Sequence, residues 1–123
     1  MELYEVMRTT FAAREFTDAP VTDAMLQRIL DNARFAPSGG NRQGWKVVVI
    51  RNEETRQGLA DIMRPSMQRY VAQVKAGEAP FNTINPSQVS DADVVNTQVP
   101  QQMLDNLTQA PVILLVFVDL AVV

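Results

Sequence analysis

Two short apolar segments constrain the fold of this chain more than any other feature. The first is Trp45-Lys46-Val47-Val48-Val49-Ile50 and the second is 112–118. Four consecutive β-branched residues favour extended backbone in the first segment, and its apolar residues on both faces predict a strand that is covered on both sides. The long connection between the segments predicts a crossover and parallel pairing. Since two strands make too small a sheet for a stable layer, we expect another chain or further sequence to complete it.

Amphipathic helices are expected before the first strand. Leu3, Val6 and Met7 recur at helical spacing and predict a short helix. Thr22 can cap a second helix, which we expect Pro37 to end because proline disfavours helix in the preceding residue. The apolar stripe of this second helix consists of Met25, Leu26, Ile29, Leu30 and Ala33.

A third helix is expected after the first strand, with Asn52 as its cap and with a kink or break at Pro65. Its predicted buried side consists of Leu59, Ile62, Met63, Tyr70 and Val74. Residues 77–99 lack a clear pattern and predict a long flexible loop, and 101–109 predict a last helix before the second strand. The order of elements predicts a mixed α/β arrangement, with α/β-type layers of helices flanking a central sheet, in a single domain spanning 1–123.

The chain of 123 residues contains neither cysteine nor histidine. This composition excludes disulfides, thiolate nucleophiles, zinc sites built on cysteine and proton transfer by imidazole. The net charge of −3 argues against general nucleic-acid binding. The acidic N-terminus resembles no signal peptide, and the longest apolar stretch, 110–123, is too short to span a bilayer and contains Asp119. We therefore expect a cytoplasmic protein without a membrane partner.

The positive charge is confined to the N-terminal part. All eleven basic residues lie between Arg8 and Lys75, whereas the stretch from Ala76 to Val123 contains five acidic residues and no lysine or arginine. An anionic ligand held by side-chain charge should therefore bind the N-terminal part, although an uneven distribution by chance explains the pattern equally well.

Two segments are candidates for ligand binding. The first contains Arg8, Thr9, Thr10 and Arg14, whose guanidinium and hydroxyl groups suit phosphate oxygens; ordinary solvated arginines at a helix end are the alternative. The second is the loop 37–44, whose glycines permit close approach of backbone to a ligand and whose amide side chains suit the edge of a planar heterocycle. A simple helix-to-strand connection is the alternative for the loop, and Trp45 after it is expected in the core.

The carboxylates form no convincing catalytic or metal-binding group. The closest pairs are Asp91 with Asp93 in a loop, Glu53 with Glu54 at a helix start, and Asp18 with Asp23 beside a turn. We therefore predict no metal site and no acid–base pair.

The two candidate segments together resemble the nitroreductase family. The resemblance is carried by Arg8-Thr9-Thr10-Phe11-Ala12-Ala13-Arg14-Glu15-Phe16 and by Pro37-Ser38-Gly39-Gly40-Asn41-Arg42-Gln43-Gly44-Trp45, followed by the valine-rich strand. It extends over essentially the whole chain, including 103–105 and Ala110-Pro111 before the second strand. Many relatives have arginine and serine where this chain has Phe11 and Ala12, and the family normally continues well beyond the second strand.

The resemblance implies an α+β fold and an FMN-dependent oxidoreductase that takes hydride from NAD(P)H and reduces nitro, quinone or similar planar acceptors. It implies a homodimer with the flavin at the interface and with the chemistry on the cofactor, so that no side chain is catalytic. Arg8, Thr9 and Thr10 would hold the phosphate, and Arg14 would lie near the N1/C2-carbonyl edge of the flavin. Pro37, Ser38 and Gly39 would approach from the partner subunit, with Asn41 as a further cofactor contact or, like Gln43, as a brace of the loop.

Two alternatives remain open at this point. A non-catalytic ligand-binding or interaction module with the same frame would bind no flavin. A nucleic-acid-binding protein is the weaker alternative, since only the basic N-terminal part and Trp45 favour it.

Overall fold

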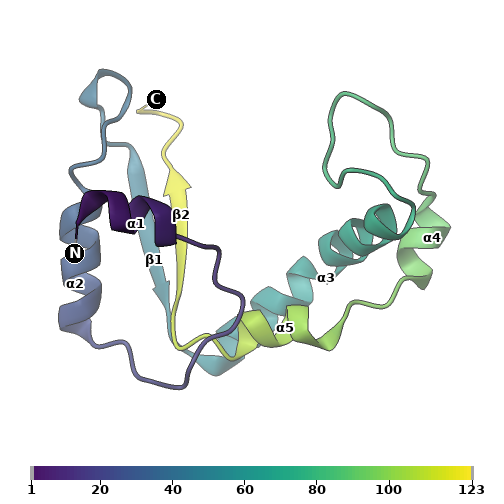
Figure 1. Cartoon of the computed structure of the whole chain (residues 1–123), viewed down its shortest axis with the longest axis horizontal. Coiled ribbons are helices and arrows are strands. Elements are labelled where there is room, and N and C mark those ends of the chain that lie inside the picture. Colours follow the sequence, from purple (N-terminus) through teal and green to yellow (C-terminus); the bar gives the residue numbers. More distant parts are fainter. Residues whose placement is uncertain (1, 123) are drawn as a thin grey trace.

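The computed structural model of the chain describes residues 2–122. In chain order its elements are α1 (Leu3–Thr9), α2 (Asp23–Ala33), a 3-10 turn (Gly39–Asn41), β1 (Trp45–Ile50), α3 (Glu53–Lys75), α4 (Asp91–Asn96), α5 (Gln101–Thr108) and β2 (Ile113–Val118). Figure 1 shows α1, α2 and the two strands at one end of the molecule, with α3 extending away from them toward α4. The helices and the small sheet agree with the predicted α+β class.

The two strands pair with each other, but they are antiparallel, so the prediction of parallel pairing was wrong. Trp45 pairs with Val118, and Ile50 pairs with Ile113. The reason lies in the connection, because α3 leads the chain away from the sheet and α5 brings it back to the end that it left (Figure 1). The connection is therefore a helical hairpin beyond one end of the sheet. Because residues 51–112 do not pass over the sheet to its other end, β2 begins at the end where β1 stops, and the strands are antiparallel.

The caps of α2 and α3 confirm the predicted helix starts. The Thr22 hydroxyl accepts a hydrogen bond from the backbone N–H of Met25 (3.2 Å), and the Asn52 side-chain oxygen accepts one from that of Thr55 (2.9 Å). The end of α2 differs from expectation, since the helix stops at Ala33 and the residues before Pro37 form tighter turns. Pro65 does not split α3, which runs as one helix through the proline.

The buried face of α3 is not the predicted one. The residues that it buries are Ala60, Met67, Val71, Ala72 and Gln73. Helices α4 and α5 contact α3, and Ala60 and Met67 pack with Leu104 of α5 in one buried cluster. The predicted stripe is largely open, and Ile62 is 79% exposed. Apolar spacing alone identified a helix correctly but could not show which face its neighbours cover.

The segment 77–99 is not wholly a loop, because it contains α4. Ser90 and Asp93 form a reciprocal capping box, in which the Ser90 hydroxyl accepts from the Asp93 N–H (3.2 Å) and the Asp93 carboxylate accepts from the Ser90 N–H (3.0 Å). The expectation of a structureless segment was therefore wrong over 91–96. The Ser-x-x-Asp pattern was the signal that could have indicated this helix.

The core is small for the length of the chain. Ala60, Met67 and Leu104 form its buried cluster between α3 and α5. The accessible surface is 9778 Å², whereas a compact monomer of 13.7 kDa exposes about 6,600 Å². The sheet shows where part of this excess lies, because Val48 and Val116 are exposed and β1 is not covered on both sides as expected.

Candidate functional site

The arginine segment lies at the end of α1 and in the extended chain that follows. Arg8 occupies the last turn of α1, and Arg14 lies in the extended chain, where its Nη1 donates to the Ala13 carbonyl (3.2 Å). The hydroxyls of Thr9 and Thr10 donate to the carbonyls of Glu5 (2.7 Å) and Val6 (2.6 Å), respectively. Since these hydroxyl protons bond to the helix, donation to a phosphate requires the threonine side chains to rotate.

The guanidinium groups of Arg8 and Arg14 keep their charge available. Within residues 2–122, neither group has a carboxylate oxygen within 4.0 Å, and both side chains are exposed. Of the nine other basic residues, four have a carboxylate partner, as in the contact between Lys46 and Asp119 (2.9 Å). Two uncompensated arginines near one another in the sequence can bind an anion without first breaking an ion pair.

The loop between α2 and β1 has an unusual backbone. Gly40, Asn41 and Gln43 adopt left-handed conformations with φ of 60°, 54° and 50°. Such a conformation costs a residue other than glycine about 1–3 kcal/mol, so the loop needs compensating contacts. A Cβ added at Gly39 would meet no atom within 4 Å outside its chain neighbours, so the space beside this backbone is open to a ligand.

Gln43 supplies most of the compensating contacts. Its backbone N–H donates to the Ser38 hydroxyl (3.0 Å), and its Nε2 donates to the Ala36 carbonyl (3.3 Å) and to Asn41 Oδ1 (2.9 Å). Its Oε1 accepts a hydrogen bond from the indole Nε1 of Trp45 (2.6 Å). Trp45 is only half-buried and therefore serves the loop as well as the packing, a role that its assignment to the core missed. The sequence carries a signal for these contacts, because Asn41, Gln43 and Trp45 follow one another at intervals of two residues.

The structure places the predicted site residues in two groups. Pro37, Ser38, Gly39 and Asn41 lie together in the loop, and the 3-10 turn is closed by the Asn41 N–H, which donates to the Ser38 carbonyl (2.8 Å). Residues 8–14 form the other group. Within the described part of the chain, no hydrogen bond or ion pair joins the two groups.

An apolar cavity of about 280 Å³ adjoins the loop. It lies between α2 and the strands, and Ala36, Pro37 and Trp45 contribute to its wall. Its remaining lining residues are Ile29, Leu30, Ala33, Ser38, Val47, Leu114 and Val116. The loop thus has polar side chains on its solvent side and adjoins an apolar cavity on its other side.

These features fit the requirements of FMN. The unpaired arginines suit its phosphate, and the open space beside Gly39 admits a flat ring against backbone. Ser38 and Asn41 offer polar groups for the ring edge. The residues that the sequence predicts therefore stay candidates for holding the cofactor, and Gln43 supports the loop from within.

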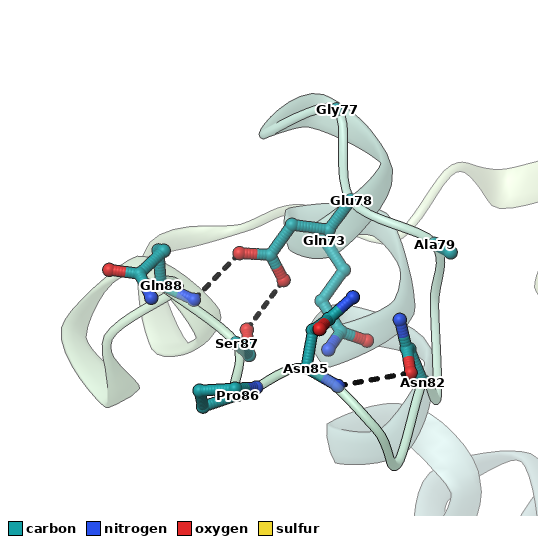
Figure 2. Close-up of a pocket in the computed structure, with 9 residues that line it drawn as sticks. All are labelled: Gln73, Gly77, Glu78, Ala79, Asn82, Asn85, Pro86, Ser87 and Gln88. Atoms are coloured by element: carbon teal, nitrogen blue, oxygen red, sulfur yellow. Dashed lines mark hydrogen bonds between the residues drawn. The ribbon is translucent and has the colours of Figure 1, made fainter.

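A second cavity, of about 320 Å³, lies at the far end of α3 and is separate from the candidate site (Figure 2). The Glu78 carboxylate spans its rim, where it accepts from the Ser87 hydroxyl (2.6 Å) and from the Gln88 N–H (2.7 Å). These two hydrogen bonds lower the pKa of the Glu78 carboxyl below its usual value. Glu78 therefore fastens the loop 78–88 to the end of α3.

This contact predicts a local pH dependence. A lowered pKa means that the stabilisation by Glu78 is present above about pH 4.5 and is lost as the pH falls through the lower folded-state value. We expect amide protection at Gln88, corrected for intrinsic exchange, to decrease over this acid range. Glu78→Gln should remove that dependence, and Glu54→Gln, at an exposed position in α3, should not. An equal acid loss of protection in the Glu78 variant would show that another group holds the loop.

Two further kinds of feature are absent from residues 2–122. Residues 2–122 contain no group of three or more carboxylates placed to bind a metal ion. None of the helices formed by these residues combines the length and the apolar character needed to cross a bilayer.

Comparison with known proteins places these features in a family. The sequence model of the nitroreductase family matches residues 7–121. A nitrobenzene nitroreductase of Ectopseudomonas oleovorans is 41% identical over 49 residues, which cover 40% of this chain and 22% of that protein. An NADH dehydrogenase of Thermus thermophilus is 38% identical over 48 residues, which cover 39% of this chain and 23% of that protein.

A solved structure supports the same assignment. It is a variant of NfnB, an FMN- and NADPH-dependent nitroreductase from Sphigopyxis sp. strain HMH, with a TM-score of 0.53 and 26% identity over 94% of this chain and 58% of that one. The segments matched in the curated relatives cover between 22% and 37% of those proteins. The fold is that of a nitroreductase-like α+β protein. The chain belongs to the nitroreductase family.

Proposed function

We propose that this chain binds FMN and serves in an oxidoreductase that takes hydride from NAD(P)H and reduces nitro, quinone or similar planar small molecules. Membership of the family supports this proposal, as does the dependence of the similar solved protein on FMN and NADPH. The observation that carries it is that Arg8 and Arg14 have no carboxylate partner among residues 2–122, in a chain that also presents the left-handed loop at Gly40. The arginines suit the phosphate of a ligand, and the loop suits its planar ring.

In this proposal different residues bind the phosphate and the ring of FMN. Arg8, with Thr9 and Thr10 after rotation of their hydroxyls, binds the phosphate. Arg14 lies at the pyrimidine edge of the ring, and the loop 37–41 covers the ring. When bound, the flavin supplies the transfer of hydride, a reaction for which the chain's own side chains have no thiol or imidazole to offer. The task of the protein is then to orient the ring and to balance its charge.

We propose that the working form is a homodimer with the flavin at the interface. The excess of accessible surface and the open faces of the sheet supply apolar area that a second copy can cover. Among the described residues no hydrogen bond or ion pair joins the arginine segment to the loop, which is compatible with an arrangement in which the loop of one copy serves the arginines of the other.

Titration of the purified chain with FMN tests the proposal directly. Binding should appear as a change in the visible absorption of the flavin and as quenching of the emission of Trp45, the only tryptophan. A protein that stays colourless after addition and removal of excess FMN would instead favour the non-catalytic module. Sedimentation of the protein with and without FMN would show whether binding accompanies association of two copies.

Arg14→Ala should lower the reduction potential of bound flavin. Reduction leaves negative charge on the ring, and a nearby cation stabilises that form by about 1.5–3 kcal/mol, or about 30–65 mV for two electrons. The potential should be measured by equilibration with a reference dye. Arg28→Ala removes the same charge from an exposed position of α2 and should leave the potential unchanged. An equal shift in both variants would indicate only a general effect of charge.

A further inference from the structure

The hydrogen bonds in the loop have a fixed direction, and Trp45 sets it. An indole N–H can only donate, so the atom of Gln43 that faces it at 2.6 Å must be the carbonyl oxygen. The Ala36 carbonyl can only accept, and it faces the other side of the same amide at 3.3 Å. Two partners of opposite character therefore hold the Gln43 amide in one of its two orientations.

The orientation of Gln43 in turn fixes that of Asn41. The Nε2 of Gln43 also donates to Asn41 Oδ1 at 2.9 Å, so the oxygen of the Asn41 amide faces the loop. Its Nδ2 is left on the other side of the amide, and the Asn41 residue is exposed. Asn41 is thus held in a left-handed backbone conformation with its side-chain oxygen turned toward Gln43 and its side-chain N–H groups available.

We propose that Trp45, Gln43 and Asn41 form a directional relay that makes Asn41 a hydrogen-bond donor toward the bound ligand. The relay selects a ligand with an acceptor atom at this point, such as a carbonyl oxygen or an unprotonated ring nitrogen of a planar heterocycle. This assignment rests on the proposed function, in which the loop covers the flavin ring. Gln43 and Trp45 are positioning residues, whereas Asn41 touches the ligand.

The relay gives the amide of Asn41 a polarity that the residue alone does not possess. A free asparagine amide turns over and offers either its oxygen or its nitrogen to a ligand. A donor held in advance costs no reorganisation on binding and grows stronger as the ring gains electrons. An acceptor in the same place would oppose the electron-rich ring.

The first test needs no ligand. Because Trp45 is the only tryptophan, its indole N–H gives a single resonance in a nitrogen-proton spectrum of the full chain. Gln43→Met keeps the length and the neutral charge of the side chain but removes every side-chain hydrogen bond of the relay. We expect exchange of the indole proton with solvent to become about fivefold faster or more. Gln27→Met, at an exposed position of α2, is the matched control and should change nothing.

The second test replaces the donor itself. Asn41→Asp keeps the oxygen that accepts from Gln43 and tolerates the left-handed backbone, but it lacks the N–H groups. Affinity for riboflavin, which has the ring without the phosphate, should fall about tenfold or more because a carboxylate now faces a ring acceptor. Gln27→Glu adds the same charge elsewhere and should bind riboflavin as the wild type does.

The outcomes separate the relay from the proposed function. If the wild type binds flavins and Asn41→Asp binds riboflavin equally well, the donor role of Asn41 is overturned. Unchanged indole exchange in Gln43→Met would overturn the relay, whatever binds. If the wild type binds neither FMN nor riboflavin, the proposed function fails, and the indole exchange then decides the relay by itself.

Discussion

Arg8→Ala is expected to weaken the binding of FMN by about tenfold to a hundredfold, because a charge-assisted hydrogen bond contributes about 1.5–3 kcal/mol. The binding of riboflavin should not change, since this ligand has no phosphate for Arg8 to contact. The guanidinium of Arg8 has no carboxylate partner within the described chain, so its loss leaves no buried charge behind. Fluorescence titration of both ligands measures the two affinities.

The comparison of ligands is the control within this experiment. Arg28→Ala, on the exposed side of α2, should leave both affinities unchanged and would reveal a general effect of net charge. A parallel loss of FMN and riboflavin binding in the Arg8 variant would place Arg8 at the ring or in the fold. An unchanged affinity for FMN would show that Arg8 at the end of α1 does not bind the phosphate.

Leu104→Ala should cause the largest loss of stability, about 2–5 kcal/mol in the free energy of unfolding. Leu104 is 8% exposed and joins Ala60 and Met67 in the buried cluster between α3 and α5. So small a core has few other contacts to fill the space, and α5 would lose its main attachment to α3. Urea unfolding followed by circular dichroism measures the change.

A matched substitution separates this effect from a general loss of apolar surface. Leu120→Ala removes the same atoms from a side chain that is 84% exposed, and it should change the free energy of unfolding by less than about 0.5 kcal/mol. Equal losses in the two variants would show that the cluster around Leu104 does not stabilise the chain more than its surface does.

Local signals predicted the elements of the fold better than their arrangement. Thr22 and Asn52 marked helix starts correctly because each cap is a contact between residues three apart. The direction of β2 depends on where α3 and α5 place the chain, which no short pattern encodes. The covered face of α3 was likewise decided by α4 and α5, which left Ile62 in solvent.

The candidate site shows the same division. Residue types and spacing, read through the family resemblance, selected Arg8 and the loop from Pro37 to Asn41. The sequence did not show that the hydroxyls of Thr9 and Thr10 bond to the carbonyls of α1, because side-chain rotation is set by local geometry. It also left the role of Gln43 open between ligand contact and brace, and the contact from Trp45 favours the brace.

The chain returns to the end of the sheet that it left, and we expect this return to set an order of folding. Contacts of α3 with α5 bring Ile50 and Ile113 together, and Arg56 on α3 adds a hydrogen bond to the Ala110 carbonyl just before β2. Strand pairing that starts at this closed end has little further loop-closure entropy to overcome at each step. We therefore expect Trp45 and Val118, the pair at the open end, to form last. The ligand loop beside Trp45 is then expected to acquire its shape late, after the helical hairpin has docked.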